Sequence, residues 1–376
     1  MARTKIENNI AYDDVKDLFY VTFNFGKDAS GKRVKNTKTF YTKKEARAAL
    51  SQHEADKNKG NMVKPSSQMC NGWFDYWLGV KKYKVEETTL YGYTNIINKH
   101  FKPYFKEYKL QEIDTTIVNQ YFNVKITEEG LSKNTVRKHQ DLLKSILMQA
   151  VNEDKLLKNP LDKIEPIKTK KNEMNFYTVE QLKKLISIVE GDKLEIVIRL
   201  AGILGLRREE ICGLKWEAVK FDDKIIVINK ARTQAGSKNI EKETKNTSSY
   251  RTLHAPDDIL DLLKLIKQTQ ESEKVFLEGN YLDQNFVVCD EDGKPTRPNY
   301  ISHLFKRIID TNQLPPIRLH DLRHTFTSIA NLQGISLFDI SKALGHSTTA
   351  TTSGIYMHMF DQTHTNAINK VSDAMK

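Results

Sequence analysis

The chain has 376 residues, of which 39% are hydrophobic and 28% are charged, and its length predicts two to three domains. The apolar residues suffice for packed cores, while the absence of any apolar run of about eighteen residues argues against a membrane-spanning protein. Lys and Arg number 59 against 48 for Asp and Glu, a net charge of +11, and a basic protein of this kind usually binds a polyanion, most often nucleic acid.

The N-terminal residues predict a small sheet followed by a helix. Every second residue is apolar at Phe19, Val21, Phe23 and Phe25. This alternation is typical of a strand with one buried face. Turn-forming residues at 26–31 lead into a second β-prone segment, residues 33–40. Thr42 and Glu45 then have the spacing of a capping box, which predicts a helix that runs through Glu54.

This first module, residues 1–64, is strongly basic, with 14 Lys and Arg against 8 Asp and Glu. The basic side chains on or next to its last predicted strand are Lys32, Arg33, Lys35 and Lys38. Because a major groove is wide enough to admit a β-ribbon, these residues are predicted to bind DNA. A solvated hairpin explains the same charges equally well, and the sequence leaves both interpretations open.

A polar linker is expected over residues 53–67, and residues 68–164 then predict a helical module. Apolar residues recur every three or four positions around 73–78, 90–101 and 115–124, and Ser132 can cap a fourth helix. The aromatic residues are expected to form the core. The first turns of the fourth helix carry a basic face that could touch the DNA backbone: Lys133, Arg137, Lys138 and His139.

A second linker is expected where prolines and basic residues follow one another, at Pro160, Pro166 and 168–171. The predicted division of the chain is therefore residues 1–64, 65–168 and 169–376.

In the third part, helices and strands alternate. Thr178 and Gln181 have capping-box spacing, and residues 225–228 and 286–289 are the clearest strands. No glycine-rich phosphate loop of the GxxxxGK[ST] type occurs in the sequence, which argues against an ATP-driven machine.

Cysteines and the N-terminus narrow the class of protein further. The widely separated Cys70, Cys212 and Cys289 form no CxxC motif, so neither a disulfide framework nor a cysteine zinc site is expected. The first residues lack the apolar core of a signal peptide, and a cytoplasmic location is expected.

Four segments of the third part carry chemistry-bearing side chains: 205–216, 245–253, 319–326 and 344–358. The first contains Arg207 at a predicted helix start, where the helix dipole disfavours a cation, so a reason for its presence such as a bound anion is expected. The third holds His320-Asp-Leu-Arg323, and the fourth holds Leu344-Gly-His346 with Tyr356 ten residues further on. Each segment alone is a weak indication of function.

In this order, the four segments resemble the tyrosine recombinases of the phage-integrase family, especially integrases of temperate phages and conjugative transposons. The resemblance implies a multidomain α+β protein. A small N-terminal three-stranded sheet with a helix would bind arm-type DNA sites, and a helical core-binding domain would follow it. A mainly α catalytic domain with a small antiparallel sheet and a C-terminal helix would complete the chain.

The resemblance also assigns roles to residues. Tyr356 matches the nucleophile, which would leave a 3′-phosphotyrosine and a free 5′-hydroxyl. The residues that match the rest of the catalytic set are Arg207, Lys245, His320, Arg323 and His346. Glu210 matches the acidic position that holds Arg207. Lys238 and Lys242 lie near Lys245 and remain alternatives for the hairpin lysine, whereas Tyr250 lacks the Leu-Gly-His spacing that marks Tyr356.

General chemistry agrees with those roles. Attack on a phosphodiester builds charge on its non-bridging oxygens, and guanidinium groups match phosphate geometry. A phenol of pKa about 10 needs a base at neutral pH, and His320 is the natural candidate. Lys245 could protonate the leaving 5′-oxygen. Because a covalent intermediate conserves the phosphoester bond energy, rejoining needs no ATP. The resemblance implies no cofactor and no metal site.

Three other classes of protein share part of this pattern. His320 and His324 share a helix face as in zinc-binding HExxH motifs, but the sequence shows no clear third ligand for a zinc hydrolase. The others are a catalytically silent DNA-binding regulator and a topoisomerase of type IB that only relaxes supercoils.

The expected partners follow from the resemblance. They are double-stranded DNA with core and arm sites, three further copies of the chain in a tetramer on DNA, and an excisionase. Residues 360–376 have helical spacing of apolar side chains and are predicted to dock on a neighbouring subunit.

Overall fold

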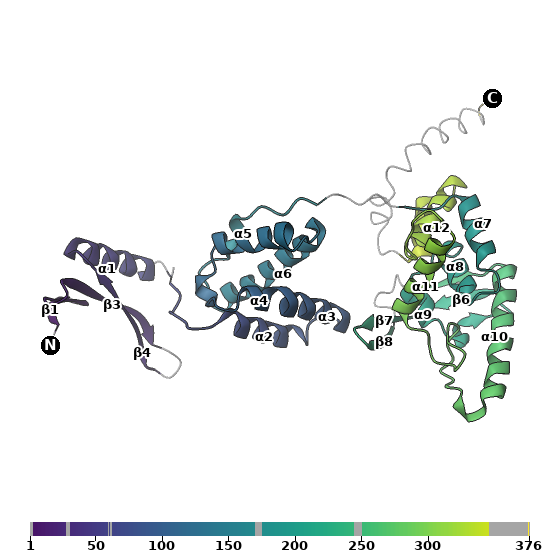
Figure 1. Ribbon diagram of the computed structural model, residues 1–376, viewed down its shortest axis with the longest axis horizontal. Helices are drawn as coiled ribbons and strands as arrows, with labels where there is room; N and C mark the ends of the chain where they lie inside the picture. The colour runs from purple at the N-terminus through teal and green to yellow at the C-terminus, as the bar shows by residue number, and fades with distance from the viewer. Residues whose placement is uncertain are drawn as a thin grey trace. The chain divides into compact units, whose positions relative to one another are not determined.

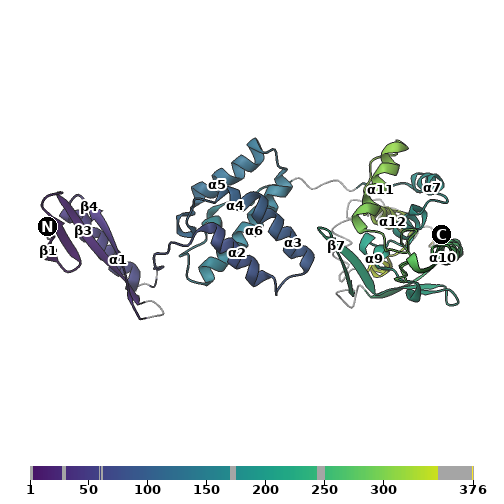
Figure 2. The ribbon, with the colours of Figure 1, turned by 60° about the horizontal axis from the view of Figure 1, so that its bottom comes forward.

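The computed structural model describes residues 3–27, 31–58, 60, 62–169, 175–243, 250–345 and 375. The chain divides into two compact units, Met1–Lys171 and Asn172–Lys376. Figures 1 and 2 show the elements of each unit as ribbons. Within the described residues, none of the helices combines the length and the apolar character needed to cross a bilayer.

The first unit begins with an antiparallel sheet in the order β1-β2-β3-β4, covered by one helix (Figure 1). The elements are β1 Thr4–Glu7, β2 Ile10–Asp13, β3 Leu18–Lys27, β4 Arg33–Phe40 and α1 Lys43–Asn58. The described residues thus form four strands where three were expected, because β1 and β2 have four residues each and are too short to show a clear period. Ile10, Val21, Phe23 and Ala46 form the buried core under the helix.

The predicted capping box of α1 is confirmed. Thr42 Oγ1 accepts from the Glu45 amide at 3.2 Å, and Glu45 Oε2 accepts from the Thr42 amide at 3.2 Å. The helix continues to Asn58, so the prediction of a linker from residue 53 is wrong over its first part. Nothing between Glu54 and Asn58 breaks a helix, since no Pro or Gly occurs there.

A helical part completes the first unit (Figure 2). Its elements are α2 Cys70–Lys81, α3 Glu87–Ile96, the π-helical turn Ile97–Phe101, α4 Lys102–Tyr104, the 3₁₀ turn Leu110–Glu112, α5 Thr115–Asn123, the π-helical turn Val124–Glu128, α6 Lys133–Asn152 and the 3₁₀ turn Pro160–Lys163. Trp73, Phe74, Trp77 and Phe101 lie in its core, as predicted for the aromatic residues, whereas Tyr76 is 48% exposed. The predicted cap of α6 is also confirmed, since Ser132 Oγ accepts from the Thr135 amide at 3.2 Å.

Two predictions for this part are wrong. His139 does not belong to a basic face: it is 1% exposed, its Nδ1 lies 2.8 Å from the Tyr121 hydroxyl, and burial lowers its pKa to about 4. On α6, the His139 ring lies on the same buried face as Val136 and Leu143. Pro160 does not mark a linker, because it is buried at the start of a 3₁₀ turn, directly before the core residue Leu161.

The second unit surrounds the buried helix α8. Its elements are α7 Val179–Ile188, α8 Leu194–Gly202, α9 Arg208–Gly213, the 3₁₀ turn Trp216–Ala218, β5 Val219–Lys220, β6 Ile225–Ile228, β7 Lys230–Ala235, β8 Lys238–Glu243, β9 Arg251–His254, α10 Asp257–Leu277, the 3₁₀ turn Glu278–Asn280, α11 Pro298–Thr311, α12 Asp321–Leu332 and α13 Leu337–Leu344. Strands β5, β6 and β9 form one antiparallel sheet in the order β5-β6-β9, and β7 pairs with β8. Small antiparallel sheets in a mainly helical unit agree with the predicted fold class.

Two local predictions can be compared with this unit. The capping box of α7 is confirmed, with the Thr178 amide 2.9 Å from Gln181 Oε1 and the Gln181 amide 3.2 Å from Thr178 Oγ1. The strand predicted at 286–289 is wrong, because only isolated bridges form, at Phe286 and at Cys289. The apolar run reflects burial of Phe286 and Val287 in a loop, which periodicity cannot distinguish from a short strand.

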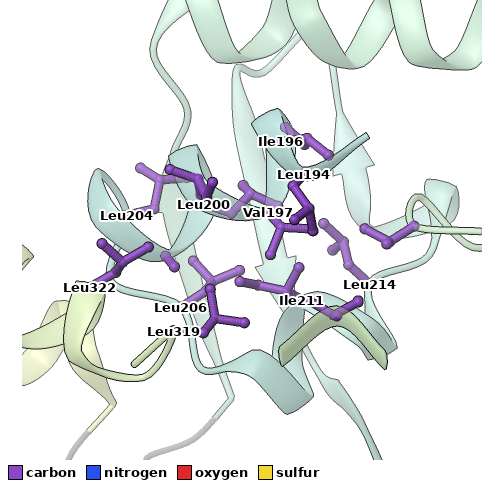
Figure 3. Packing of buried hydrophobic residues seen from close by; sticks show 14 of the residues in the cluster. Leu194, Ile196, Val197, Leu200, Leu204, Leu206, Ile211, Leu214, Leu319 and Leu322 are labelled. Atoms are coloured by element: carbon purple, nitrogen blue, oxygen red, sulfur yellow. The ribbon is translucent and has the colours of Figure 1, made fainter. Parts of the chain in front are cut away.

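The core of this unit holds the segments that carry the candidate site. Figure 3 shows Leu194, Val197 and Leu200 of α8 packed with Leu206, Ile211, Leu319 and Leu322. Leu206 precedes Arg207, Ile211 follows Glu210, and Leu319 precedes His320 in the chain. Core packing therefore fixes the backbone on which each of these charged side chains is mounted.

Candidate active site

Arg207 stands directly before α9, at the end of a tight turn from α8. Gly205 has φ +67°, and a Cβ there would lie 2.8 Å from Phe326 and 2.9 Å from Leu344. A glycine is therefore required on two counts, the left-handed backbone and the close approach of α12 and α13. The side chain of Arg207 remains 29% exposed.

Glu210 holds Arg207 through a capping box. The Arg207 amide donates to Glu210 Oε2 at 2.8 Å, and Arg207 Nη1 donates to Oε1 at 2.8 Å. The anion expected near this helix start is thus supplied inside the protein, which offsets the unfavourable position of a cation at a helix N-terminus.

A second guanidinium, which sequence analysis did not identify, binds the same carboxylate. Arg251 at the start of β9 donates from Nη1 to Glu210 Oε1 at 3.0 Å and from Nη2 to Oε2 at 2.8 Å. Burial raises the pKa of Glu210, but the hydrogen bonds and charges of Arg251 and Arg207 outweigh burial and lower that pKa to about 2. The carboxyl is therefore ionised throughout the physiological range.

Arg323 joins the two turns that flank the site. Its Nη1 donates to the Gly205 carbonyl at 2.6 Å, and its Nη2 donates to the Leu344 carbonyl at 2.6 Å. Arg323 is 3% exposed, far less than Arg207. It thereby fixes the turn before Arg207 against the end of α13. Gly345, which caps α13 directly after Leu344, has φ +64°.

His320 precedes α12 and lines an open pocket of about 800 Å³, together with Arg208, Glu209, Lys306 and Arg318 among others. The covered part of its ring and the guanidinium of Arg323 lower its pKa, so the imidazole is neutral at pH 7. It can therefore accept a proton there.

Asp321 and His324 support the start of α12. Asp321 Oδ2 accepts from the Arg318 amide at 2.9 Å, so it braces the start of this helix. His324 packs edge-to-face on His320, with ring centroids 5.4 Å apart, and burial lowers its pKa to about 4. In the described part of the chain, no group of three or more His, Cys, Asp or Glu could hold a metal ion.

Several predicted site residues lie outside the described residues, namely Lys245, His346, Tyr356 and the segment 360–376. Lys238 and Lys242, the alternatives for the hairpin lysine, lie on β8. Tyr250 is 58% exposed next to Arg251. The structure thus brings together Arg207, Glu210, Arg323 and His320 at adjoining ends of α9, α12 and α13.

The predicted DNA-binding residues lie on the surface of the first unit. Lys32, Arg33, Lys35, Lys38, Lys133 and Lys138 are exposed, whereas Arg137 is half-buried and pairs with Asp141 at 3.0 Å. The sheet register separates the residues of β4: Lys35 pairs with Asn24 on the helix-free face, and Lys38 pairs with Val21 on the face that α1 covers. Lys38 therefore does not share a surface with Lys35, although the sequence grouped the two as DNA-binding residues. Arg33 shares the face of Lys35, two residues along the strand.

Comparison with protein-family models decides the family. Residues 175–363 match the model described as the phage integrase family, and residues 71–126 match the phage integrase N-terminal SAM-like domain. The chain belongs to the phage integrase family. It is accordingly a tyrosine recombinase, a site-specific DNA strand-transfer enzyme, as the four motifs indicated.

Curated relatives agree with this membership. The recombinase is 28% identical over 384 residues to the tyrosine recombinase XerC-like protein of Caldanaerobacter subterraneus, with 95% of this chain and 96% of the relative covered. It is also 28% identical to the ICEBs1 integrase of Bacillus subtilis, over 74% of this chain and 76% of that protein. These similarities support the recombinase, not the silent regulator or the relaxing enzyme.

Solved structures share the fold. The integrase of transposon Tn1549 in complex with transposon right-end DNA aligns with a TM-score of 0.67 at 18% identity, over 81% of this chain and 100% of that one. A lambda integrase dimer bound to a core site aligns with a TM-score of 0.57 at 17% identity, covering 94% of this chain and 96% of that one.

Proposed function

We propose that this recombinase is the integrase of a mobile element, which integrates and excises that element through a 3′-phosphotyrosine on Tyr356. The observation that carries the proposal is the cluster at the ends of α9, α12 and α13. There the buried Glu210 carboxylate holds the partly exposed Arg207 by two hydrogen bonds, and the neutral imidazole of His320 lies beside them. The relatives named above include integrases of a transposon and of ICEBs1.

Each proposed step follows from these side chains. Arg207, with His346, would stabilise the charge that develops on the non-bridging oxygens of the scissile phosphate. Arg323, whose Nη atoms donate to the Gly205 and Leu344 carbonyls, would add its positive charge from within the site. The Tyr356 phenol oxygen bonds to phosphorus while the bond from phosphorus to the 5′-oxygen breaks. His320 takes the phenolic proton, because its lowered pKa keeps the imidazole neutral at pH 7. Lys245, or Lys238 or Lys242 of β8, gives a proton to the departing 5′-oxygen.

Rejoining reverses these steps with a 5′-hydroxyl from the partner duplex. The number of phosphoester bonds is unchanged, so the reaction requires no nucleotide hydrolysis.

We further propose a division of labour along the chain. Residues 1–64 bind arm sites, residues 65–168 bind the core site, and residues 169–376 carry the chemistry. In the first module, the helix-free face of the sheet presents Arg33 and Lys35 to DNA, with Lys32 in the adjoining turn. In the second module, the exposed start of α6 presents Lys133 and Lys138, with Arg137 beside them.

Assembly is proposed on chemical grounds. Exchange between two duplexes requires four strand cleavages, so four copies of the chain would act as a tetramer on DNA. Residues 360–376 would dock on a neighbouring subunit, and an excisionase would favour removal of the element. All of these steps would occur in the cytoplasm, where the element's DNA lies.

A nicked suicide duplex, made from the end of the element that encodes the chain, tests the proposal. Wild-type protein should form a covalent adduct that resists EDTA, and mass spectrometry should find the nucleotide on Tyr356. The Tyr356→Phe variant should bind the duplex and form no adduct. Linkage to another residue, or loss of the adduct on chelation of divalent ions, would overturn the proposed function.

A further inference from the structure

The Glu210 carboxylate is shared between two arginines of different exposure. Four hydrogen bonds between described residues reach it, two from Arg207 and two from Arg251, at 2.8–3.0 Å. A carboxylate offers about four lone-pair sites, so these donors occupy its full capacity. Glu210 is 3% exposed, and water cannot substitute for either partner.

The two guanidinium groups differ in what they can reach. Arg251 is 8% exposed, and its Nε donates to the Ala343 carbonyl near the end of α13 at 2.7 Å. Its two Nη atoms face Glu210. A phosphate in solvent can therefore meet the side chain of Arg207, which is 29% exposed, but has little access to Arg251.

Charge counting shows what Arg251 adds. With both arginines, the group of Arg207, Glu210 and Arg251 carries one net positive charge. Without Arg251, Glu210 and Arg207 would neutralise each other, and the fork of Arg207 would turn to the oxygens that Arg251 vacates. The attraction of this group for a developing phosphorane anion would then be largely lost.

We propose that Arg251 is a positioning residue of the recombinase: it neutralises Glu210 on both oxygens, so that Arg207 keeps its charge and orientation for the scissile phosphate. The inference rests on the proposed function, in which Arg207 binds that phosphate.

The position of Arg251 in the fold suits this role. The residue opens β9, where it pairs with Ile228 of β6, so the sheet fixes its backbone. Its side chain then spans from β9 to Glu210 of α9 and to Ala343 of α13. The adjacent carbonyl of Leu344 is held by Arg323. From β9, Arg251 thus holds the start of α9 and the end of α13 in fixed positions relative to each other.

Three full-length variants test the proposal on the nicked suicide duplex described above: Arg251→Gln, Arg251→Lys and the control Arg199→Gln. Arg199 is a matched control, because it pairs with the buried Glu195 at 2.8 Å and lies on α8 and not among the site residues. Arg251→Gln should bind the duplex as wild type does and form adduct about 10- to 100-fold more slowly, less than the full cost of a direct donor. Arg251→Lys, which keeps the charge and loses the fork, should fall between. Arg199→Gln should cleave at the wild-type rate.

A double variant separates positioning from mere stability. In an Arg207→Ala background, adding Arg251→Gln should slow cleavage by a clearly smaller factor than it does in the wild-type background, because the residue that Arg251 positions is already gone. Two results would overturn the inference and leave the proposed function intact. One is a double variant whose rate of adduct formation falls by the full product of the two single-variant factors. The other is an Arg251→Gln variant that forms adduct as fast as Arg199→Gln. Circular dichroism confirms folding, and should Arg251→Gln not fold, Arg251→Lys carries the same comparison. If wild-type protein forms no adduct, both proposals fall together.

Discussion

Replacing Glu210 by Gln should strongly destabilise the second unit. The carboxylate is 3% exposed and compensates the buried guanidinium of Arg251, which is itself 8% exposed. A glutamine keeps one acceptor oxygen and turns an amide donor toward guanidinium donors, so one arginine loses its partner. Breaking a buried ion pair on one side typically costs about 3–5 kcal/mol. For a unit of this size, that loss corresponds to a fall in Tm of about 6–20 °C.

Hydrogen exchange measured by mass spectrometry on the full-length protein is the suitable assay, because it resolves the two units. Peptides from α9 and β9 of the Glu210→Gln variant should exchange faster, and peptides from α2 to α6 should be unchanged. The exchange of the same peptides measured at increasing urea concentration supplies the free energy of unfolding of the second unit.

Glu217→Gln is the matched control. Glu217 pairs with Lys230 at 3.1 Å, but its side chain is 55% exposed, so its loss should cost at most about 1 kcal/mol. A Glu210→Gln variant that loses no more than this control would refute the reasoning, since the carboxylate would then not be needed to compensate two buried or half-buried cations.

Three further predictions concern the site, the sheet and the helical core. Arg207→Ala should keep duplex affinity and slow adduct formation by about 10²–10³-fold in single-turnover assays, and wild-type rates would contradict its role at the phosphate. Replacing Arg33 and Lys35 by Gln should lower the salt dependence of arm-site binding, by about two in the slope of log K against log salt, whereas Lys38→Gln, on the opposite face of the sheet, should leave the slope near wild type. The pKa of His139 falls from 6.5 to about 4 because burial, His100 and Lys125 disfavour the imidazolium. The unfolded chain therefore binds the proton first, so stability should fall by about 3 kcal/mol as pH drops from 6.5 to 4. Urea unfolding at each pH should show a weaker dependence for His139→Gln.

Local chemistry along the chain was sufficient to predict much of the fold. The caps at Thr42, Ser132 and Thr178 depend on residues three apart, and all three form as expected. Helices with a clear apolar stripe, such as α6, were predictable for the same reason. Such features require no knowledge of distant parts of the chain.

Predictions that depended on tertiary context were wrong or missing. His139 lies among Lys133, Arg137 and Lys138 in sequence, yet it shares the buried face of α6 with other core residues and lies 2.8 Å from the Tyr121 hydroxyl. The ion pair of Arg251 with Glu210 joins residues 41 positions apart. A single arginine beside an exposed tyrosine gives no indication of a buried partner. Near Glu210, Arg207 and Arg208 already balance the charges of Glu209 and Glu210 in the sequence, so no unmatched charge indicates a further partner.

The distribution of core residues explains why the site can be preorganised. Leu206, Leu319 and Leu322 are at most 5% exposed, and each directly precedes a charged or titratable residue of the site, Arg207, His320 or Arg323. Each polar side chain therefore begins from a backbone that the apolar core already holds in place (Figure 3). Hydrogen bonds between the site residues then fix the side chains, at Glu210 for Arg207 and at two carbonyls for Arg323. The orientation of the cations is thus established when the unit folds, so they need little reorganisation when a phosphate binds. Such preorganised cations stabilise the charge of a transition state strongly.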